Sequence, residues 1–305
     1  MARRFSAAYQ TEPLSSLALW ARRLAVFSAV AALVSIVIVR FGFLEVKPAL
    51  VTFFGALAFA GLSILLALAG FAAIWRNGSR GMSRILLALL LDAVILAYPA
   101  YLGLQYRKLP AIHDITTDPI DPPRFEALAR LRTGDGTNTA VYAGLYSAEL
   151  QRAAWPDIEP VDLDVPVQRA YDVALAVVTK RKWLIIDERA PQPPRRIGHI
   201  EAVARTPVMG FREDVTIRVA PDGDGSRVDI RSSSRYFESD LGSNAARVAK
   251  LIDDINSAAE NTPRPKKPPV VVPKAPAKSV AKRHFPRCHS GAGAASAGPE
   301  PGIPR

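Results

Sequence analysis

Two side chains in the segment 196–205 have the types and spacing of a metal site. His199 and Glu201 lie two positions apart in a stretch that alternates polar and apolar residues, so a strand would place both on one face. Imidazole nitrogen and carboxylate oxygen are common zinc ligands, and Asp214 would complete a set of three if the fold brought it near. The alternative is that His199 and Glu201 lie on a solvated face of the sheet.

Other motifs that carry enzyme chemistry are missing. The sequence has no G-x-S-x-G, no H-E-x-x-H, no Walker A loop and no pair of cysteines. His113 and Asp114 are neighbours in a segment rich in Pro and Asp. The single cysteine, Cys288, has only His284 and His289 nearby, a set too sparse to predict a metal site. We therefore expect no catalytic residues, no cofactor and no metal, while catalysis itself stays open.

A second group of candidates lies where a predicted strand ends and a predicted helix begins. Arg231, Arg235 and Arg247 would converge there, and the free N–H groups of a helix start favour anions. Hydroxyl and amide side chains would add neutral donors. The predicted anion- or carboxylate-binding set is Arg231, Ser232, Ser234, Arg235, Asp240, Asn244 and Arg247. The alternative is a buried network of Arg and Asp that stabilises the turn, with Asp240, Ser243 or Asn244 as helix caps.

The same segment carries a resemblance to a known family. GFREDVTIRV and RSSSRYFESDLGSNAARV resemble the bacterial domain of unknown function (DUF) 1499 family, in which a Phe and an acidic pair precede a strand. An Arg-Ser-x-Ser-Arg strand end and an Asp-Leu-Gly-x-Asn turn then lead into the last helix. The matching positions are Phe211, Glu213, Asp214, Arg231, Ser232, Ser234, Arg235, Asp240, Leu241, Gly242, Asn244 and Arg247. Tyr236-Phe237 departs from the usual glycine. The resemblance covers about residues 110–258 and implies a domain type in a membrane-anchored member, without a reaction.

The elements that would hold these residues indicate an α+β fold. Apolar residues at helical spacing predict helices near 167–178 and 243–259, and alternation predicts four strands between them. Short turns favour an antiparallel sheet packed on helices in two layers. Across the turn at 222–225, Arg218 would face Asp229 and Asp214 would lie diagonal to Arg231, which are favourable cross-strand pairs.

Three apolar stretches precede this domain, at about 20–39, 50–75 and 85–106. A helix of about 20 residues rises roughly 30 Å, which is the thickness of a bilayer core. The amino-terminal side of the stretches carries seven nearby Lys or Arg residues and the other side four. This bias predicts a cytoplasmic segment 1–19, a three-helix transmembrane region 20–109 of the inner (plasma) membrane, and a periplasmic location for everything after about residue 108.

Asp92 is the one carboxylate inside these stretches. A charged residue at membrane depth is costly, so its side chain should face protein or water. One hypothesis is an ion or proton relay. The other is a hydrogen-bonded residue that holds the three helices together.

The carboxyl-terminal stretch 261–305 follows the domain of residues 110–260. The whole chain has a net charge of +11, and this stretch carries nine Lys or Arg residues, one acid and ten prolines. Such a composition predicts a disordered tail. Its charge would attract anionic lipid or polymer, and the alternative is a plain solubilising tail. Nucleic acid is excluded as a partner by the predicted periplasmic location.

The sequence thus predicts a membrane-anchored periplasmic binding or scaffolding domain that acts in the cell envelope without catalysis. The expected partners are the lipid bilayer and an envelope protein or anionic ligand. One alternative is a metal- or acid-dependent envelope hydrolase, and the other is a membrane sensor or transport accessory that uses Asp92.

Overall fold

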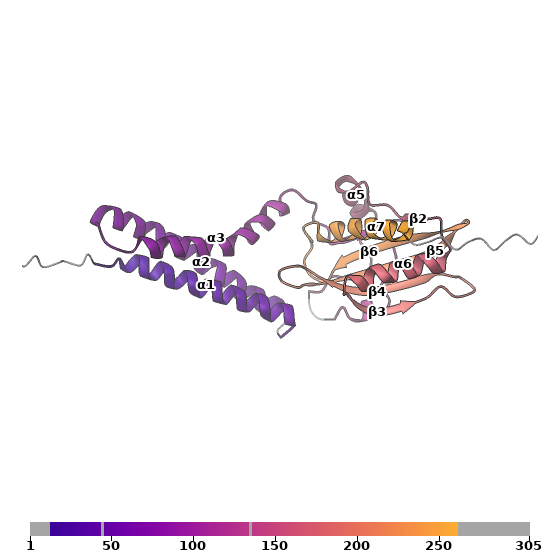
Figure 1. The fold of residues 1–305 in the computed structure, drawn as a ribbon, viewed down its shortest axis with the longest axis horizontal. Coiled ribbons are helices and arrows are strands. Elements are labelled where there is room, and N and C mark those ends of the chain that lie inside the picture. The colour runs from indigo at the N-terminus through magenta and orange to yellow at the C-terminus, as the bar shows by residue number, and fades with distance from the viewer. Residues whose placement is uncertain (1–12, 44–45, 134–135, 262–305) are drawn as a thin grey trace, which may run out of the picture. The chain divides into compact units, whose positions relative to one another are not determined.

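The structure is a computed structural model that describes residues 13–43, 46–133 and 136–261. Within these residues, three long apolar helices precede an α+β domain, as the sequence predicted (Figure 1). The predicted disordered tail, apart from Asn261, lies outside the described residues, and so does most of the predicted cytoplasmic segment.

The amino-terminal helices are α1 (Ser16–Phe41), α2 (Val46–Asn77) and α3 (Met82–Tyr106). Each is long and apolar enough to cross a membrane. Helix α1 extends beyond its apolar stretch at both ends because its polar and glycine caps lie outside that stretch. Ser15 accepts a hydrogen bond from the Ala18 N–H, and Gly42 adopts a left-handed φ of 74° to end α1.

Small side chains form the contacts between these helices. The buried positions of α1 and α2 are almost all Ala, Ser or Gly, whereas the large apolar side chains point outward. Small residues allow helix backbones to approach closely where lipid provides no hydrophobic driving force. The buried set is Ala18, Ala21, Ala25, Ser28, Ala32, Ser35 and Val39 on α1, and Ala49, Ala56, Ala60, Ser63, Ala67 and Gly70 on α2.

Asp92 lies inside this bundle with no exposed surface. The Ser63 hydroxyl oxygen is 2.6 Å from Asp92 Oδ2 and 3.0 Å from the carbonyl oxygen of Ala21. Residues from all three helices therefore meet at one hydroxyl. Asp92 Oδ1 has no hydrogen-bond partner among the described residues. This geometry favours the hypothesis that Asp92 holds the helices together.

The domain that follows contains six strands and four helices within the described residues. The strands form one antiparallel sheet in the order β1-β6-β5-β4-β3, and β2 also pairs with β6. The strands are β1 (Asp114–Thr116), β2 (Val161–Leu163), β3 (Leu184–Arg189), β4 (Gly198–Arg205), β5 (Arg212–Asp222) and β6 (Gly225–Ser234). The helices are α4 (Ala127–Arg130), α5 (Leu145–Ala154), α6 (Val167–Lys180) and α7 (Ser243–Asn261).

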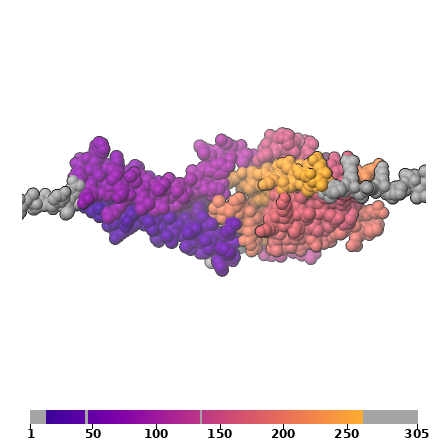
Figure 2. Space-filling view, in the orientation of Figure 1, coloured from indigo at the N-terminus to yellow at the C-terminus, as the bar shows by residue number. Residues whose placement is uncertain are grey.

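Helices α6 and α7 lie side by side against one face of the sheet (Figures 1 and 2). Their apolar stripes meet the alternate apolar residues of β4, β5 and β6 in a single core. Leu251 of α7 is fully buried in that core. The predicted two-layer arrangement is confirmed.

The hairpin of β5 and β6 has the predicted register. Arg218 lies opposite Asp229, and Arg231 lies opposite Thr216, which places Asp214 diagonal to Arg231. The pairing continues to Asp222 and Gly225, so the strands are longer and the turn is shorter than the sequence indicated.

Two short strands were not predicted. One of them, Asp114–Thr116, lies in the segment rich in Pro and Asp and pairs with the outer edge of β6. The N–H and C=O groups of Thr116 are in turn bonded to the side-chain amide of Gln151, at 3.0 and 2.7 Å. An amide from α5 thus takes the place of a neighbouring strand, which leaves less of this edge open to intermolecular pairing.

We predict that Leu251→Ala lowers the free energy of unfolding of the domain by about 2–5 kcal/mol, because it leaves a cavity between α7 and the sheet. Urea unfolding of the purified full chain in detergent, followed by tryptophan fluorescence, measures this. Leu184→Ala is the matched control, since Leu184 is 63% exposed. Equal losses in the two variants would contradict the assigned core.

Candidate functional site

The face of the sheet away from α6 and α7 carries charged side chains. Because side chains alternate along a strand, the residues between the core positions of β4, β5 and β6 all point to this second face. Residues 117–133 and 136–142 cover part of it. Two neighbourhoods result: a closed network of arginines and carboxylates, and an open pocket.

Arg231 occupies the centre of the closed network and is 2% exposed. Its Nε and Nη2 donate to the two oxygens of Asp114 at 3.0 and 2.6 Å. Its remaining donors reach the carbonyl oxygens of Pro123 and Ala140, and its guanidinium lies over the ring of Phe125 at 4.6 Å. A buried charge is tolerated only when it is paired and hydrogen-bonded in this way.

Asp214 is the second centre of the network and is fully buried. Arg132 and Arg235 each lie 2.8 Å from one of its oxygens. Asp214 is therefore held by two arginines, and it does not join His199 and Glu201, contrary to the metal hypothesis from the sequence.

A third group lies on the α7 side of the sheet. Arg247 is bonded to Glu213, and Glu213 also accepts from the hydroxyls of Ser234 and Ser243. The Asn244 amide nitrogen donates to Ser234, while its oxygen accepts from Ser232 and Arg247. These contacts join the end of β6 to the start of α7.

Asp240 caps α7, accepting from the N–H groups of Gly242 at 2.9 Å and Asn244 at 2.7 Å. Burial raises the pKa of this carboxyl to about 6, against the lowering effect of those N–H groups. Asp240 thus has the capping role that was the alternative to ligand binding.

The structure divides the seven predicted binding residues between these groups. Arg231, Arg235 and Arg247 each have a carboxylate partner, and none of the seven lines the open pocket described below. Anion binding by this set stays a prediction.

His199 and Glu201 share one face of β4, as expected, but that face is not solvated. Glu201 is fully buried, because the start of α4 covers it. Its carboxylate accepts from the N–H groups of Glu126 and Leu128 at 2.6 Å and of Ala127 at 3.3 Å. Glu201 therefore caps the short helix α4.

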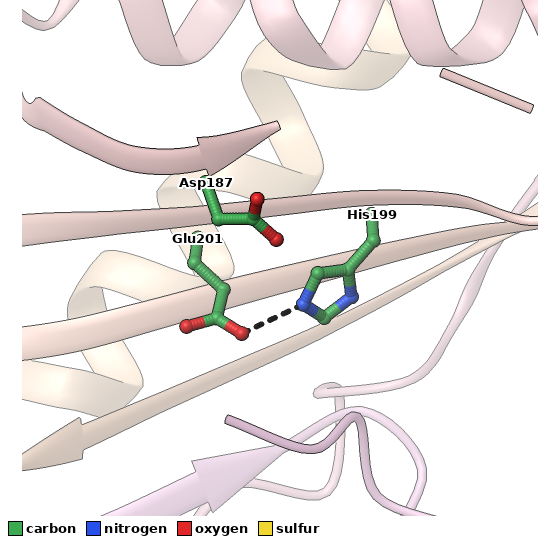
Figure 3. Close-up of side chains that lie close together, drawn as sticks. All are labelled: Asp187, His199 and Glu201. Atoms are coloured by element: carbon green, nitrogen blue, oxygen red, sulfur yellow. Dashed lines mark hydrogen bonds and ion pairs between the residues drawn. The ribbon is translucent and has the colours of Figure 1, made fainter. Parts of the chain in front are cut away.

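His199 completes the environment of this carboxylate, with its Nε2 atom 2.8 Å from Glu201 Oε1 (Figure 3). Burial alone would raise the pKa of Glu201, but the bonds from His199 and the N–H groups of Leu128 and Glu126 lower it overall. An ionised carboxylate can only accept a hydrogen bond, so the Nε2–H group of His199 is the donor. This bond orients the ring and leaves Nδ1 as its other polar atom.

Asp187, not Asp214, is the third member of the cluster. One ligand atom from each of Asp187, His199 and Glu201 lies within 4.8 Å of the others. Figure 3 shows the Asp187 side chain on the neighbouring strand, beside the pair on β4. The register of β3 shifts between Ile185 and Asp187, and Asp187 pairs with Glu201 across the strands. No sequence signal identified this irregularity, so Asp187 was missed.

An open pocket of about 800 Å³ lies beside this cluster. Its lining includes Arg124, Glu126, Arg189, Arg195, His199 and Arg218, and we call it the arginine pocket. Arg189 is paired with Glu126 at 2.7 Å, and Arg218 with Asp121 at 2.7 Å. Arg124 and Arg195 are exposed and have no carboxylate partner among the described residues.

One comparison with known proteins finds a family match within the domain. Residues 114–255 match the family described as protein of unknown function (DUF1499). The match begins at the first residue of β1 and ends in α7, so it contains the whole sheet, the closed network and the arginine pocket. This supports the family resemblance of the sequence. No curated protein matched the chain.

We predict that Asp114→Asn destabilises the domain by about 3–5 kcal/mol, because it leaves the Arg231 charge buried without a compensating charge. Urea unfolding of the full chain measures the loss. The matched control is Glu126→Gln, which removes the half-exposed partner of Arg189 and should cost less than about 1 kcal/mol. A similar small effect of both substitutions would show that the buried pair is not required.

Proposed function

We propose that the domain of residues 114–255, which matches DUF1499, is a membrane-anchored binding domain that takes up a small anionic ligand in the arginine pocket. The chain would act in the cell envelope without catalysing a reaction. The three apolar helices would hold the domain at the membrane, and the pocket would recognise the negative charge of the ligand.

The contrast between paired and unpaired arginines carries this proposal. In the closed network each buried guanidinium is matched by a carboxylate, as folding stability requires. In the arginine pocket, Arg124 and Arg195 are exposed and have no such partner among the described residues. Guanidinium groups bind carboxylate and phosphate through two parallel hydrogen bonds, which suits an anionic ligand.

His199 adds a polar ring to the same pocket. Its ring is 12% exposed, and its orientation is held by the buried Glu201 carboxylate. With Nε2 donating to Glu201, Nδ1 of the neutral ring accepts a hydrogen bond, which suits a ligand that keeps a proton, such as hydrogen phosphate. The pocket therefore combines two unpaired guanidinium groups with an oriented imidazole.

Binding of inorganic phosphate and succinate to the full chain in detergent, measured by calorimetry, tests the pocket. Arg124→Gln/Arg195→Gln should weaken binding about tenfold or more, which corresponds to about 1.4 kcal/mol. Arg130→Gln/Arg152→Gln is the control, because both of these arginines are exposed outside the pocket. Binding of neither anion to the wild-type chain, or equal binding by both double variants, would contradict the proposal.

The proposed side of the membrane is periplasmic, with the amino terminus in the cytoplasm. Three crossings would leave the two ends of the helical region on opposite sides of the membrane, and the excess of Lys and Arg supports a cytoplasmic amino terminus. Alkaline phosphatase, which is active only outside the cytoplasm, should be active when fused after residue 108 and inactive when fused after residue 80. The reverse pattern would invert the orientation.

A metal-dependent hydrolase is the second candidate, favoured by the spacing of Asp187, His199 and Glu201. Glu201 already accepts three N–H bonds from the start of α4, which limits its availability as a ligand. Stoichiometric zinc bound by the wild-type chain and lost in His199→Ala would favour this candidate. Zinc binding that is unchanged by His199→Ala would exclude the cluster as its site.

A further inference from the structure

Two loops and the connection from the membrane helices lie at one end of the sheet. β1 begins at Asp114 opposite Ser233, near the end of β6. The same end contains the end of β4 and the start of β5, where Arg205 lies opposite Arg212. The loops at this end are 206–211, between β4 and β5, and 235–242, between β6 and α7. We call them the proximal loops.

Chain connectivity keeps the proximal loops close to the end of α3. Leu109 follows the last residue of that helix by three positions, and a side chain added at Gly242 would meet Leu109 at 3.0 Å. Three residues span at most about 11 Å. The loop 235–242 therefore lies within about one helix diameter of the point where α3 ends in Tyr106.

The two proximal loops also contact each other through aromatic side chains. The rings of Phe211 and Phe237 meet edge to face with centroids 5.3 Å apart. Phe237 is nevertheless 48% exposed. An aromatic ring that is half exposed on a loop next to a membrane helix is suited to the bilayer interface.

The charges of this end point to the same partner. Arg205 and Arg212 lie directly opposite each other, both are exposed, and neither is paired with a carboxylate among the described residues. Arg205 donates to the carbonyl oxygen of Arg40 at the end of α1, but this neutral partner leaves both positive charges uncompensated, and like charges at facing positions destabilise a sheet. Anionic lipid headgroups attract such cations at a membrane surface.

We propose that the proximal loops rest on the bilayer, with the ring of Phe237 in the interfacial layer and Arg205 and Arg212 bound to anionic lipid headgroups. This rests on the membrane anchoring of the proposed function and not on the ligand of the arginine pocket. The domain is then held in one orientation instead of moving freely on its tether.

This orientation directs the arginine pocket away from the membrane. His199 and Arg205 are six residues apart along β4, so about 20 Å separates the pocket from the proximal end. Arg189, at the end of β3, lies opposite His199 at the same distal end. The pocket would therefore receive a water-soluble anion, while lipid headgroups occupy the proximal arginines.

Spin labelling of the full chain in nanodiscs of phosphatidylcholine and phosphatidylglycerol tests the proposal. Cys288→Ser removes the only cysteine, and Phe237→Cys then takes a nitroxide label. Val208→Cys in the other proximal loop is a second labelling site. Asp224→Cys, at the exposed distal turn of the β5–β6 hairpin, is the matched control.

The labels at 237 and 208 should be relaxed more by oxygen, which concentrates in lipid, than by a water-soluble nickel complex. The label at 224 should show the opposite preference. A label at 237 or 208 that behaves like the one at 224 overturns the proposal. Extraction of the chain by alkaline carbonate would instead show that membrane anchoring, and thus the proposed function, fails.

Arg205→Gln/Arg212→Gln tests the role of headgroup charge. With the wild-type arginines, replacing phosphatidylcholine partly by phosphatidylglycerol should shift the label at 237 toward greater oxygen accessibility. The double variant should lose that shift, whereas Arg130→Gln/Arg152→Gln should keep it. A shift that persists in Arg205→Gln/Arg212→Gln would show that these arginines do not bind anionic lipid.

Discussion

The ion pair between Asp114 and Arg231 is the interaction on which the domain depends. It joins β1, the first strand after the membrane helices, to β6 in the sheet, with both side chains almost fully buried. Removing two charges from water costs free energy. This cost is offset only because each nitrogen of the guanidinium donates a hydrogen bond. Arg231 also donates to the carbonyl oxygens of Pro123 and Ala140, so the same arginine holds the chain that covers this face of the sheet.

The polar face of the sheet therefore has two parts, one closed to solvent and one open to it. Where the covering segment closes over the sheet, arginines and carboxylates are matched, and the contacts serve stability. Where it opens, at the end of β3 and the start of β4, two arginines have no carboxylate partner within the described part of the chain and lie beside an oriented histidine. We propose a binding function for the open part. An exposed cation without a carboxylate partner costs little free energy there, because water or an anionic ligand solvates it.

Regular patterns made much of the fold predictable. The register of the β5–β6 hairpin followed from alternation and the turn at 222–225, since one slipped residue would move every apolar side chain to the other face. The candidate site was less predictable. Glu201 and His199 were found by spacing, but the cover over them comes from α4, some seventy residues earlier in the chain. Asp187 entered the cluster through a shift of strand register that has no local signature.

The sequence by itself determined the three apolar helices, the α+β class, the two-layer packing and the facing of Arg218 and Asp229. These follow from periodicity, which acts between residues close in the chain. Only the tertiary structure decided which carboxylate each arginine meets. Arg231 is paired with Asp114, and Arg132 and Arg235 are paired with Asp214. Among the described residues, Arg124 and Arg195 are paired with no carboxylate. These pairs join residues 117, 82 and 21 positions apart, and the choice among many possible partners depends on burial, which no local pattern encodes.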